Sequence, residues 1–323
     1  MNSNPYFIPV LFEKQLTADS PVKVWLIDTP VVLVKSKDAI HAYEDFCPHR
    51  GAPLSKGFVK DGVLTCRYHG WEFNANGKNK HVPVKNAAVD CELKRIQVAV
   101  KYGIIWISKD STALIPELSE ELPAFTLNGK IHASILNTLE NFLEGSHTHF
   151  VHDGLVRSKK ITRQKIEATL IPSETGFSVH YQSEPPKGLL TVLTPARFRN
   201  LRAVSTYMHP NISVLEYWND ANIRVARIEG ILSTQQTQTV YLARIYLHLG
   251  LFTPIATMIA KPIFKKIIQQ DKVILELQEK NLQHFKQPSF VSDETDVVGV
   301  EIQRWLYNKE NRAVEPFNFT VYW

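Results

Sequence analysis

The sequence predicts an α+β protein whose first third is all-β and whose remainder joins a run of antiparallel strands to a long helix. Three observations support this prediction. Short runs rich in β-branched residues continue to about Ser108, strand-like segments of alternating polarity occupy residues 165–248, and an apolar helical period covers Pro262–Phe285. We therefore expect a small β domain followed by a larger mixed domain.

The composition is that of a soluble globular protein with two domains of ordinary size. The chain has 323 residues, of which 44% are hydrophobic and 21% charged. The formal charge is only +5, and basic runs such as residues 157–160 are short, as on a solvated surface. No basic stripe with interleaved aromatic residues is present, so we expect no nucleic-acid partner.

Neither a secretory signal nor a membrane span is predicted. The first seven residues lack a positive region followed by an apolar core. The most apolar window, Leu247–Ala260, contains His248, Gly250 and Pro254 and is shorter than the roughly 20 residues that a span needs. We therefore expect a cytoplasmic protein with no membrane partner. The three cysteines argue against a disulfide framework and leave metal binding or burial.

The first domain begins with short strands. Val22–Ile27 and Val31–Lys35 flank the turn at Asp28–Pro30 and predict a hairpin. Ala39–Glu44 predicts another strand, and Gly103–Ser108 predicts the strand that closes the domain.

Two loops in this domain each pair one thiol with one imidazole. The first contains Cys47-Pro-His49, and the second contains Cys66-Arg-Tyr-His69. Both residue types bind iron or zinc, and the neighbouring prolines and glycines constrain the loops so that four ligands can converge. From the residues alone, the set could hold one tetrahedral zinc ion or a two-iron, two-sulfide cluster.

The spacing and the surrounding residues resemble the Rieske ligand pattern. Cys47-x-His49, sixteen residues and then Cys66-x-x-His69 occur in the contexts Cys-Pro-His-Arg-Gly and Tyr-His-Gly-Trp. The resemblance implies a Rieske [2Fe-2S] cluster held by these four side chains. Cys91 has no comparable partners and is expected to be a small buried hydrophobic residue. The basic residues near the loops predict either a solvated surface or a docking patch for an acidic electron donor: Lys56, Lys60, Arg67, Lys78 and Lys80.

A linker separates this domain from the rest of the chain. Asp110–Phe125 combines Pro116 and Pro123 with several acidic residues, which is typical of a connection between domains. We place the boundary near Pro116, with a first domain over residues 1–115 and a second over residues 116–323.

One carboxylate and three imidazoles lie within nine residues of the second domain. Ile131–Leu136 predicts a strand leading into a helix that starts around Asn137 or Thr138 and carries Glu144 and His147 on one face. His147 and His152 are five residues apart, or roughly 140° around an ideal helix, so they can share a metal only if the helix distorts or ends between them. Asp153-Gly154 offers a stop just beyond. His149 and His152 share a face more easily, so geometry alone does not choose the pair.

A third protein ligand is predicted on the later helix. Asp271 falls on the apolar face of the segment Pro262–Phe285, where an unpaired carboxylate is costly and should bind a metal or pair with a buried Arg or Lys. Glu276 instead lies four residues from Lys272 and Lys280, the spacing of a solvated ion-pair face. The residues that define the apolar face are Phe264, Ile267, Ile268, Ile274 and Leu275.

Between the histidines and this helix, six strands are predicted. They cover 165–170, 177–182, 202–209, 212–218, 224–232 and 239–248, and turn signals separate them at Glu174–Gly176, Pro185–Gly188, Pro210-Asn211 and Asn219–Asn222. One more helix is predicted over residues 295–309, and the tail Phe317–Trp323 is apolar enough to dock.

The run Asn141-x-x-Glu144-x-x-His147-x-x-x-x-His152 resembles the iron-binding helix of Rieske non-haem iron oxygenases, and Gln270-Asp271 is similar to their segment for the third ligand. The resemblance implies a catalytic domain of the helix-grip type, a curved antiparallel sheet over a long helix. It also implies Fe(II) bound by His147, His152 and Asp271, with His149 outside the site.

The resemblance further implies roles for two residues on the metal-binding helix. The family carboxylate at position 144, usually Asp, joins a cluster histidine of a neighbouring subunit to an iron histidine of its own. Here Glu144 would connect His69 of one chain to His147 of the next, and the extra methylene requires a slightly different geometry. Asn141 matches a common family asparagine that holds this bridge or lines the pocket; a surface role is the alternative.

The resemblance implies a terminal oxygenase component with O2 as co-substrate, similar to the homotrimeric monooxygenase and demethylase branch. Its substrate would be a small aromatic or hydrophobic molecule, and aromatic-ring cis-dihydroxylation is the alternative reaction. No flavin- or nicotinamide-binding glycine fingerprint is found, so NAD(P)H would act through a separate ferredoxin or flavin reductase. Two other classes remain open from the residues: a non-enzymatic Rieske electron carrier with a ligand-binding domain, and a zinc-stabilised binding module.

Overall fold

The computed structural model describes residues 5–36, 39–152, 154–156, 164–182, 201–285, 290–307 and 312–322. The basic run at 157–160, Asp153, the turn predicted at Pro185–Gly188 and the terminal Trp323 lie outside the described residues. The chain divides into two compact units, Met1–Glu120 and Glu121–Trp323. The division falls a few residues after the linker proline at which the sequence predicts it.

The first unit is built on a six-stranded antiparallel sheet in the order β1-β10-β9-β4-β3-β2. The predicted hairpin is confirmed, because Leu26 pairs with Thr29 across a two-residue turn, and β10 closes the unit at Ser108 as expected. The strands are β1 (Ile8–Phe12), β2 (Val22–Leu26), β3 (Thr29–Lys35), β4 (Ile40–Glu44), β9 (Arg95–Lys101) and β10 (Ile104–Ser108). Alternate residues such as Val31, Leu33 and Ile105 are fully buried in its core.

A second, four-stranded sheet of this unit holds the loops that contain cysteine and histidine. It consists of β5 (Phe58–Lys60), β6 (Val63–Thr65), β7 (Glu72–Phe73) and β8 (Asn79–His81), paired in sequence order. Leu54, Leu64 and Phe73 form a small core that also contains both ligand cysteines. Because β4 and β6 lead into the two loops, the packing of these strands sets where the loops start.

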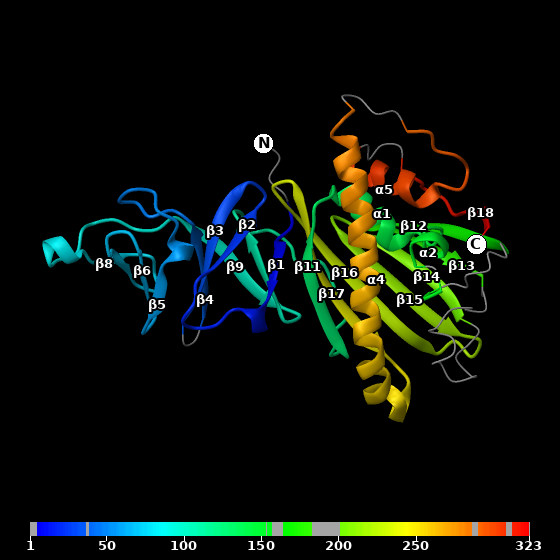
Figure 1. Cartoon of the computed structure of the whole chain (residues 1–323), viewed down its shortest axis with the longest axis horizontal. Coiled ribbons are helices and arrows are strands. Elements are labelled where there is room, and N and C mark those ends of the chain that lie inside the picture. The colour runs from blue at the N-terminus through cyan, green and yellow to red at the C-terminus, as the bar shows by residue number, and fades with distance from the viewer. Residues whose placement is uncertain are drawn as a thin grey trace. The chain divides into compact units, whose positions relative to one another are not determined.

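The second unit is an eight-stranded antiparallel sheet with the long helix α4 (Thr253–Leu282) across one face, which confirms the α+β class (Figure 1). The strand order is β11-β17-β16-β15-β14-β13-β12-β18. The strands are β11 (Phe125–Ile131), β12 (Lys165–Ser173), β13 (Gly176–Tyr181), β14 (Leu201–Met208), β15 (Ile212–Asn219), β16 (Arg224–Gln235), β17 (Gln238–Leu247) and β18 (Phe317–Tyr322). The other helices are α1 (Ile135–Leu143), α2 (Thr148–Val151) and α5 (Val297–Tyr307).

The core of the second unit lies between the sheet and these helices. Leu170, Val179 and Ile245 from the strands pack in one cluster with Leu139 of α1 and Leu275 of α4. The six predicted strands match β12 to β17. They were predictable because one face of each strand is buried against the helices, which produces alternating polarity in the sequence. The helix predicted over residues 295–309 corresponds to α5.

Several predicted boundaries were wrong. The strand before the histidines ends at Ile131, and α1 begins at Ile135 because the Ser134 hydroxyl caps it by accepting a hydrogen bond from the Asn137 amide at 3.2 Å. The helix that carries Asp271 starts at Thr253, and Pro262 lies inside it. Pro262 is exposed, so water can bind the carbonyl that loses its intrahelical donor.

Of two smaller features of the second unit, the first differs from the sequence prediction and the second confirms it. Ile274 is exposed rather than part of the apolar face of α4. The apolar tail docks as a strand, because β18 pairs with β12 along six residue pairs. Among the described residues, no helix combines the length and apolar character required to cross a bilayer.

Candidate metal centres

The two cysteine–histidine loops have the same backbone geometry. In each, the cysteine carbonyl accepts a hydrogen bond from the amide four residues later, Gly51 at 2.8 Å and Gly70 at 3.0 Å. Each cysteine amide in turn donates to the carbonyl five residues later at 2.9 Å. Both glycines have positive φ, 73° and 71°, and a β-carbon at either would lie 2.9 Å from a neighbouring side chain. Two matching loops of this kind present thiol and imidazole groups toward a common centre.

The four side chains fit a two-iron, two-sulfide cluster. Cys47 and Cys66 are both 2% exposed. The imidazole rings of His49 and His69 are adjacent, with centroids 4.6 Å apart. The buried Nδ1 of His49 has no hydrogen-bond partner within the described chain. Two buried thiols beside two imidazoles, one with an unsatisfied nitrogen, form a donor set that metal coordination would satisfy.

The pKa of the Cys47 thiol is raised to about 11, chiefly by burial and also by the neighbouring Cys66, while hydrogen bonds from the His49 and Arg50 amides oppose the shift. Without a cation the Cys47 thiol therefore remains protonated at neutral pH. A bound metal reverses this preference, because its charge stabilises thiolate ligands.

Neighbouring residues hold the first loop in place. The carboxylate of Asp45 accepts hydrogen bonds from the amide of Ser55 at 2.7 Å and from its hydroxyl at 2.6 Å, which joins the two ends of the loop. The indole of Trp71 stacks on His49 with centroids 4.6 Å apart and an interplanar angle of 8°. These contacts restrict the orientation of the imidazole before any metal binds.

The helix that carries the second group of ligands ends before the first histidine. α1 stops at Leu143, and Glu144 is its C-terminal cap with an extended backbone. His147 and His152 are the residues immediately before and after the short helix α2. The shared helical face predicted for Glu144 and His147 is therefore wrong. The break in the helix falls before His147, not between the two histidines. α2 is continuous between them, and helical backbone ends at His152, where φ is −109° and ψ is 33°.

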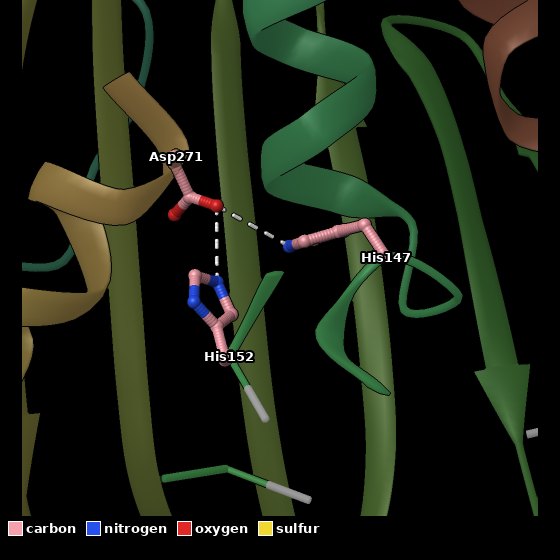
Figure 2. A group of neighbouring side chains, drawn as sticks. All are labelled: His147, His152 and Asp271. Atoms are coloured by element: carbon pink, nitrogen blue, oxygen red, sulfur yellow. Dashed lines mark ion pairs between the residues drawn. The ribbon is translucent and has the colours of Figure 1, made fainter. Parts of the chain in front are cut away.

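His147, His152 and Asp271 converge on one point (Figure 2). The Asp271 Oδ1 atom lies 3.0 Å from Nε2 of His152 and 3.5 Å from Nε2 of His147. One potential ligand atom from each residue lies within 4.8 Å of the other two. Ligands bonded to one ion at about 2.1 Å are about 3 to 4 Å apart, so the group can hold a metal with little movement. His149 is outside this group of described residues.

Asp271 reaches this point because α4 packs on the sheet along one side. Phe264, Ile268 and Leu275 of α4 contact the core, and Asp271 is buried on the same side. No Arg or Lys lies within salt-bridge distance of Asp271 in the described part of the chain, and its ionic contacts are to His147 and His152. Glu276 instead pairs with Lys272 at 3.8 Å, as the ion-pair spacing predicts.

Second-sphere side chains orient each imidazole. The Nδ1 of His147 pairs with the carboxylate of Glu144, and the Nδ1 of His152 lies 3.1 Å from Oε1 of Gln270. An oxygen acceptor at Nδ1 favours the proton on that nitrogen, so Nε2 of each ring, which lies toward Asp271, is the nitrogen available to a metal. Asn141 is buried in α1, and its amide nitrogen lies 3.5 Å from Asp271 Oδ1.

The charges near His147 shift its pKa and that of Glu144. Burial lowers the pKa of His147, but the hydrogen bond and charge of Glu144 together with the charge of Asp271 outweigh it, so the net shift is upward. Burial also opposes ionisation of Glu144, whose pKa is nevertheless lowered by His147 and by the hydroxyl and amide of Ser146. The carboxylate is therefore anionic and matched to a cationic ring or to a metal-bound one.

Gln270 is the functional residue whose role the sequence did not reveal. It lies beside Asp271 in the chain, yet its importance depends on His152, which is 118 residues away. An amphipathic helix offers no signal that separates a half-buried glutamine from its exposed neighbour Gln269.

Comparison with known proteins identifies the families of the two parts of the chain that hold the candidate centres. Residues 6–99 match the Rieske [2Fe-2S] domain, and residues 131–312 match the vanillate O-demethylase oxygenase C-terminal domain. A vanillate O-demethylase oxygenase subunit of Pseudomonas sp. strain HR199 is 30% identical over 174 residues, which cover 51% of this chain and 49% of that protein. The dicamba O-demethylase oxygenase component of Stenotrophomonas maltophilia is 29% identical over 242 residues, which cover 71% of this chain and 66% of that protein.

Solved structures show the same fold over nearly the whole chain. The crystal structure of dicamba monooxygenase bound to dicamba superposes with a TM-score of 0.77 and 20% identity, covering 95% of this chain and 96% of that one. NdmA of Pseudomonas putida CBB5 superposes with a TM-score of 0.70, also at 20% identity. The matched part of this chain spans about half the length of the first curated relatives. Since one family model covers more than half of the chain, the protein belongs to the Rieske oxygenase family whose catalytic domain is that of the vanillate O-demethylase oxygenases.

Proposed function

We propose that this chain is a terminal oxygenase component that monooxygenates a small aromatic or hydrophobic substrate, by hydroxylation or by O- or N-demethylation. The observation that carries the proposal is the convergence of His147, His152 and Asp271 in a chain that also has a Rieske domain. Two histidines and one carboxylate on one side of a metal are typical of non-haem iron that reacts with oxygen.

The proposed roles of the residues follow from the geometry. Cys47, His49, Cys66 and His69 would hold the cluster, and the three converging residues would hold Fe(II). When bound, the cluster supplies electrons and the iron supplies a site for dioxygen chemistry. Glu144 and Gln270 hold the two imidazoles with Nε2 toward the metal position, and the buried Asn141 restricts the Asp271 carboxylate.

A second role is proposed for Glu144, as the link between His147 of its own chain and His69 of a neighbouring chain in a homotrimer. The exposure of His69 supports this role, because a ligand that meets another subunit must be accessible in the single chain. Within the chain both oxygens of Glu144 already accept hydrogen bonds, from Ser146 and His147. The longer side chain lets the Glu144 carboxylate turn back to His147 of its own chain. One of these hydrogen bonds within the chain would break when the subunits assemble.

The names of the relatives support demethylation as the reaction class. Vanillate and dicamba O-demethylase components match the sequence, and NdmA has been solved with caffeine and with theobromine. We propose that a separate ferredoxin or flavin reductase delivers electrons from NAD(P)H. A 3-chlorobenzoate-3,4-dioxygenase oxygenase subunit is 29% identical over 206 residues, which keeps ring dihydroxylation as the second candidate.

Metal analysis tests the assignment of the ligands. An oxygenase should contain three irons and two acid-labile sulfides per chain, an electron carrier two irons, and a zinc module neither. We expect His152→Ala to lose one iron and retain the absorption spectrum of the cluster. His149→Ala is the matched control and should retain all three irons. An unchanged iron content in His152→Ala would exclude the proposed site.

Turnover tests the reaction class. Small methoxy- and N-methyl-aromatic compounds should stimulate oxygen uptake with a surrogate reductase, and demethylation should release one formaldehyde per oxygen consumed. A cis-diol product without formaldehyde would establish dihydroxylation instead. Glu144→Ala, loaded with excess Fe(II) so that both metal centres are filled, should slow electron transfer between them; rapid transfer in that variant would remove the proposed link.

A further inference from the structure

The N-terminal end of α4 and the turn before it expose a group of large apolar side chains. Leu251 is 96% exposed, Met258 78% and Ile255 60%, and Phe252 and Ile259 are also exposed. We call these five residues the α4 tip. An exposed apolar group of this size on one helical segment is unusual on a soluble surface and marks an interaction site.

Basic residues adjoin the tip and acidic residues are missing from it. Lys261, Lys265 and Lys266 are exposed one to two turns after Met258. No Asp or Glu occurs between Leu249 and Gln270, so the segment has only positive formal charge. In the described part of the chain, no salt bridge involves these three lysines, so their charges remain available to a partner.

The α4 tip does not pack against the core of its own unit. The side of α4 that packs on the core carries Ala260, Phe264 and Ile268, whereas Ile255 and Lys266 point away from it at helical spacing. Figure 1 shows the yellow N-terminal turns of α4 extending past the neighbouring strands. The apolar end is therefore presented outward, with the lysines set back along the same helix.

We propose that the α4 tip docks on an anionic lipid membrane, with its apolar side chains in the interface and the lysines at the headgroups. Apolar side chains followed by a cluster of lysines match the two layers of a membrane surface, acyl boundary and anionic phosphate. An anionic bilayer offers an apolar layer and an anionic layer in the same order as the apolar side chains and the lysines along α4. Asp271 lies sixteen residues after Ile255, or about 24 Å along the helix, so the metal position would stay outside the bilayer.

This proposal is independent of the proposed oxygenase activity. It departs from the expectation of a protein without a membrane partner, which rested on the short length of the apolar segment Leu247–Ala260. A tip that enters only the membrane–water interface does not need an apolar segment long enough to cross the bilayer.

Vesicle binding tests the apolar part of the tip. The full-length holoprotein should sediment with vesicles of 70% phosphatidylcholine and 30% phosphatidylglycerol, and not with pure phosphatidylcholine vesicles. The double variant Ile255→Glu with Met258→Glu should bind at least tenfold more weakly. Val314→Glu is the control, because this side chain is 86% exposed just before β18, at the opposite edge of the sheet from β17; it should bind like the unmodified protein. All variants should retain the same circular dichroism and the same molecular mass in solution.

The lysines give a separate measurement. Each of Lys261→Gln, Lys265→Gln and Lys266→Gln should weaken binding about fivefold at low salt, and the triple variant about 100-fold. Lys280→Gln, at an exposed lysine near the other end of α4, is the matched control and should have no such effect. Binding should also decline as salt is raised.

Three outcomes would overturn the proposal. The first is no sedimentation of the unmodified protein with anionic vesicles. The second is binding that the tip variants do not change. The third is a smaller assembly in the Ile255→Glu and Met258→Glu variant, which would identify the tip as a contact between copies of the chain.

Discussion

The hydrogen bond between Gln270 and His152 should determine how tightly the mononuclear site binds iron. In Gln270→Leu the side chain keeps its approximate volume but no longer accepts a hydrogen bond from Nδ1 of His152. The ring would then be free to exchange tautomers or rotate, and Nε2 would no longer be committed to the metal position facing Asp271. The ligands themselves are unchanged, so any effect reports orientation alone.

The expected magnitude follows from the burial of the bond. The distance is 3.1 Å, and the His152 side chain is only 2% exposed, so water cannot replace the lost acceptor. Loss of such an outer-sphere partner weakens metal binding by about 10- to 100-fold, or about 1.4 to 2.8 kcal/mol. Gln270→Glu should bind at least as tightly as the unmodified protein, because a carboxylate also accepts from Nδ1 and increases the basicity of the ring.

The assay is an anaerobic titration of Fe(II) into protein depleted of its mononuclear iron, in competition with a chromogenic chelator. The cluster spectrum provides the internal check that the first domain is intact. Gln269→Leu is the matched control, because Gln269 is the exposed neighbour of Gln270 on the same helix. It should leave the affinity unchanged.

Equal affinities for Gln270→Leu and Gln269→Leu would refute the reasoning. The hydrogen bond would then not orient His152, and the packing of the ring alone would hold it. Weakened binding in both variants would point to a general effect on α4 instead.

Two further predictions concern the stability of the second unit. Glu229→Gln should lower the free energy of unfolding by about 3 to 5 kcal/mol in denaturant titrations, because Glu229 is fully buried and its loss leaves the Arg244 charge uncompensated. Glu216→Gln, at a partly exposed carboxylate, should lower the free energy of unfolding clearly less. Equal losses in the two variants would contradict the role of burial. The hydrogen bond from His248 lowers the pKa of Glu121, so this pair should stabilise the protein above the ordinary carboxyl pKa, and its contribution should disappear as pH falls through the depressed value. Melting temperatures between pH 6 and pH 3 should therefore fall more for the unmodified protein than for Glu121→Gln, and parallel curves would exclude the linkage.

Local chemistry explains which parts of the sites were predictable. The cysteine–histidine loops are short, and their glycines are required by positive backbone angles, so residue type and spacing alone indicate a paired metal site. The strands β12 to β17 were predictable because burial of one face leaves a period of two in the sequence. By contrast, the helix predicted through Glu144 and His147 was wrong, although Gly145, directly after the cap residue Glu144, is a residue type that commonly ends helices.

The sequence alone indicated four candidate metal ligands in the two cysteine–histidine loops, a dense group of histidines between positions 147 and 152, and Asp271 as an unexpected carboxylate on an apolar helix face. These inferences depend on periodicity and on neighbours in the chain, which local sequence records directly. Only the tertiary structure decided that the helix breaks before His147, that Asp271 meets the two imidazoles, and that Gln270 and Glu144 orient them. It also decided that the apolar N-terminal end of α4 is exposed rather than buried. These features depend on contacts between segments more than one hundred residues apart, or on which side of a helix packs against another element. Neither kind of contact produces a periodic pattern in the sequence.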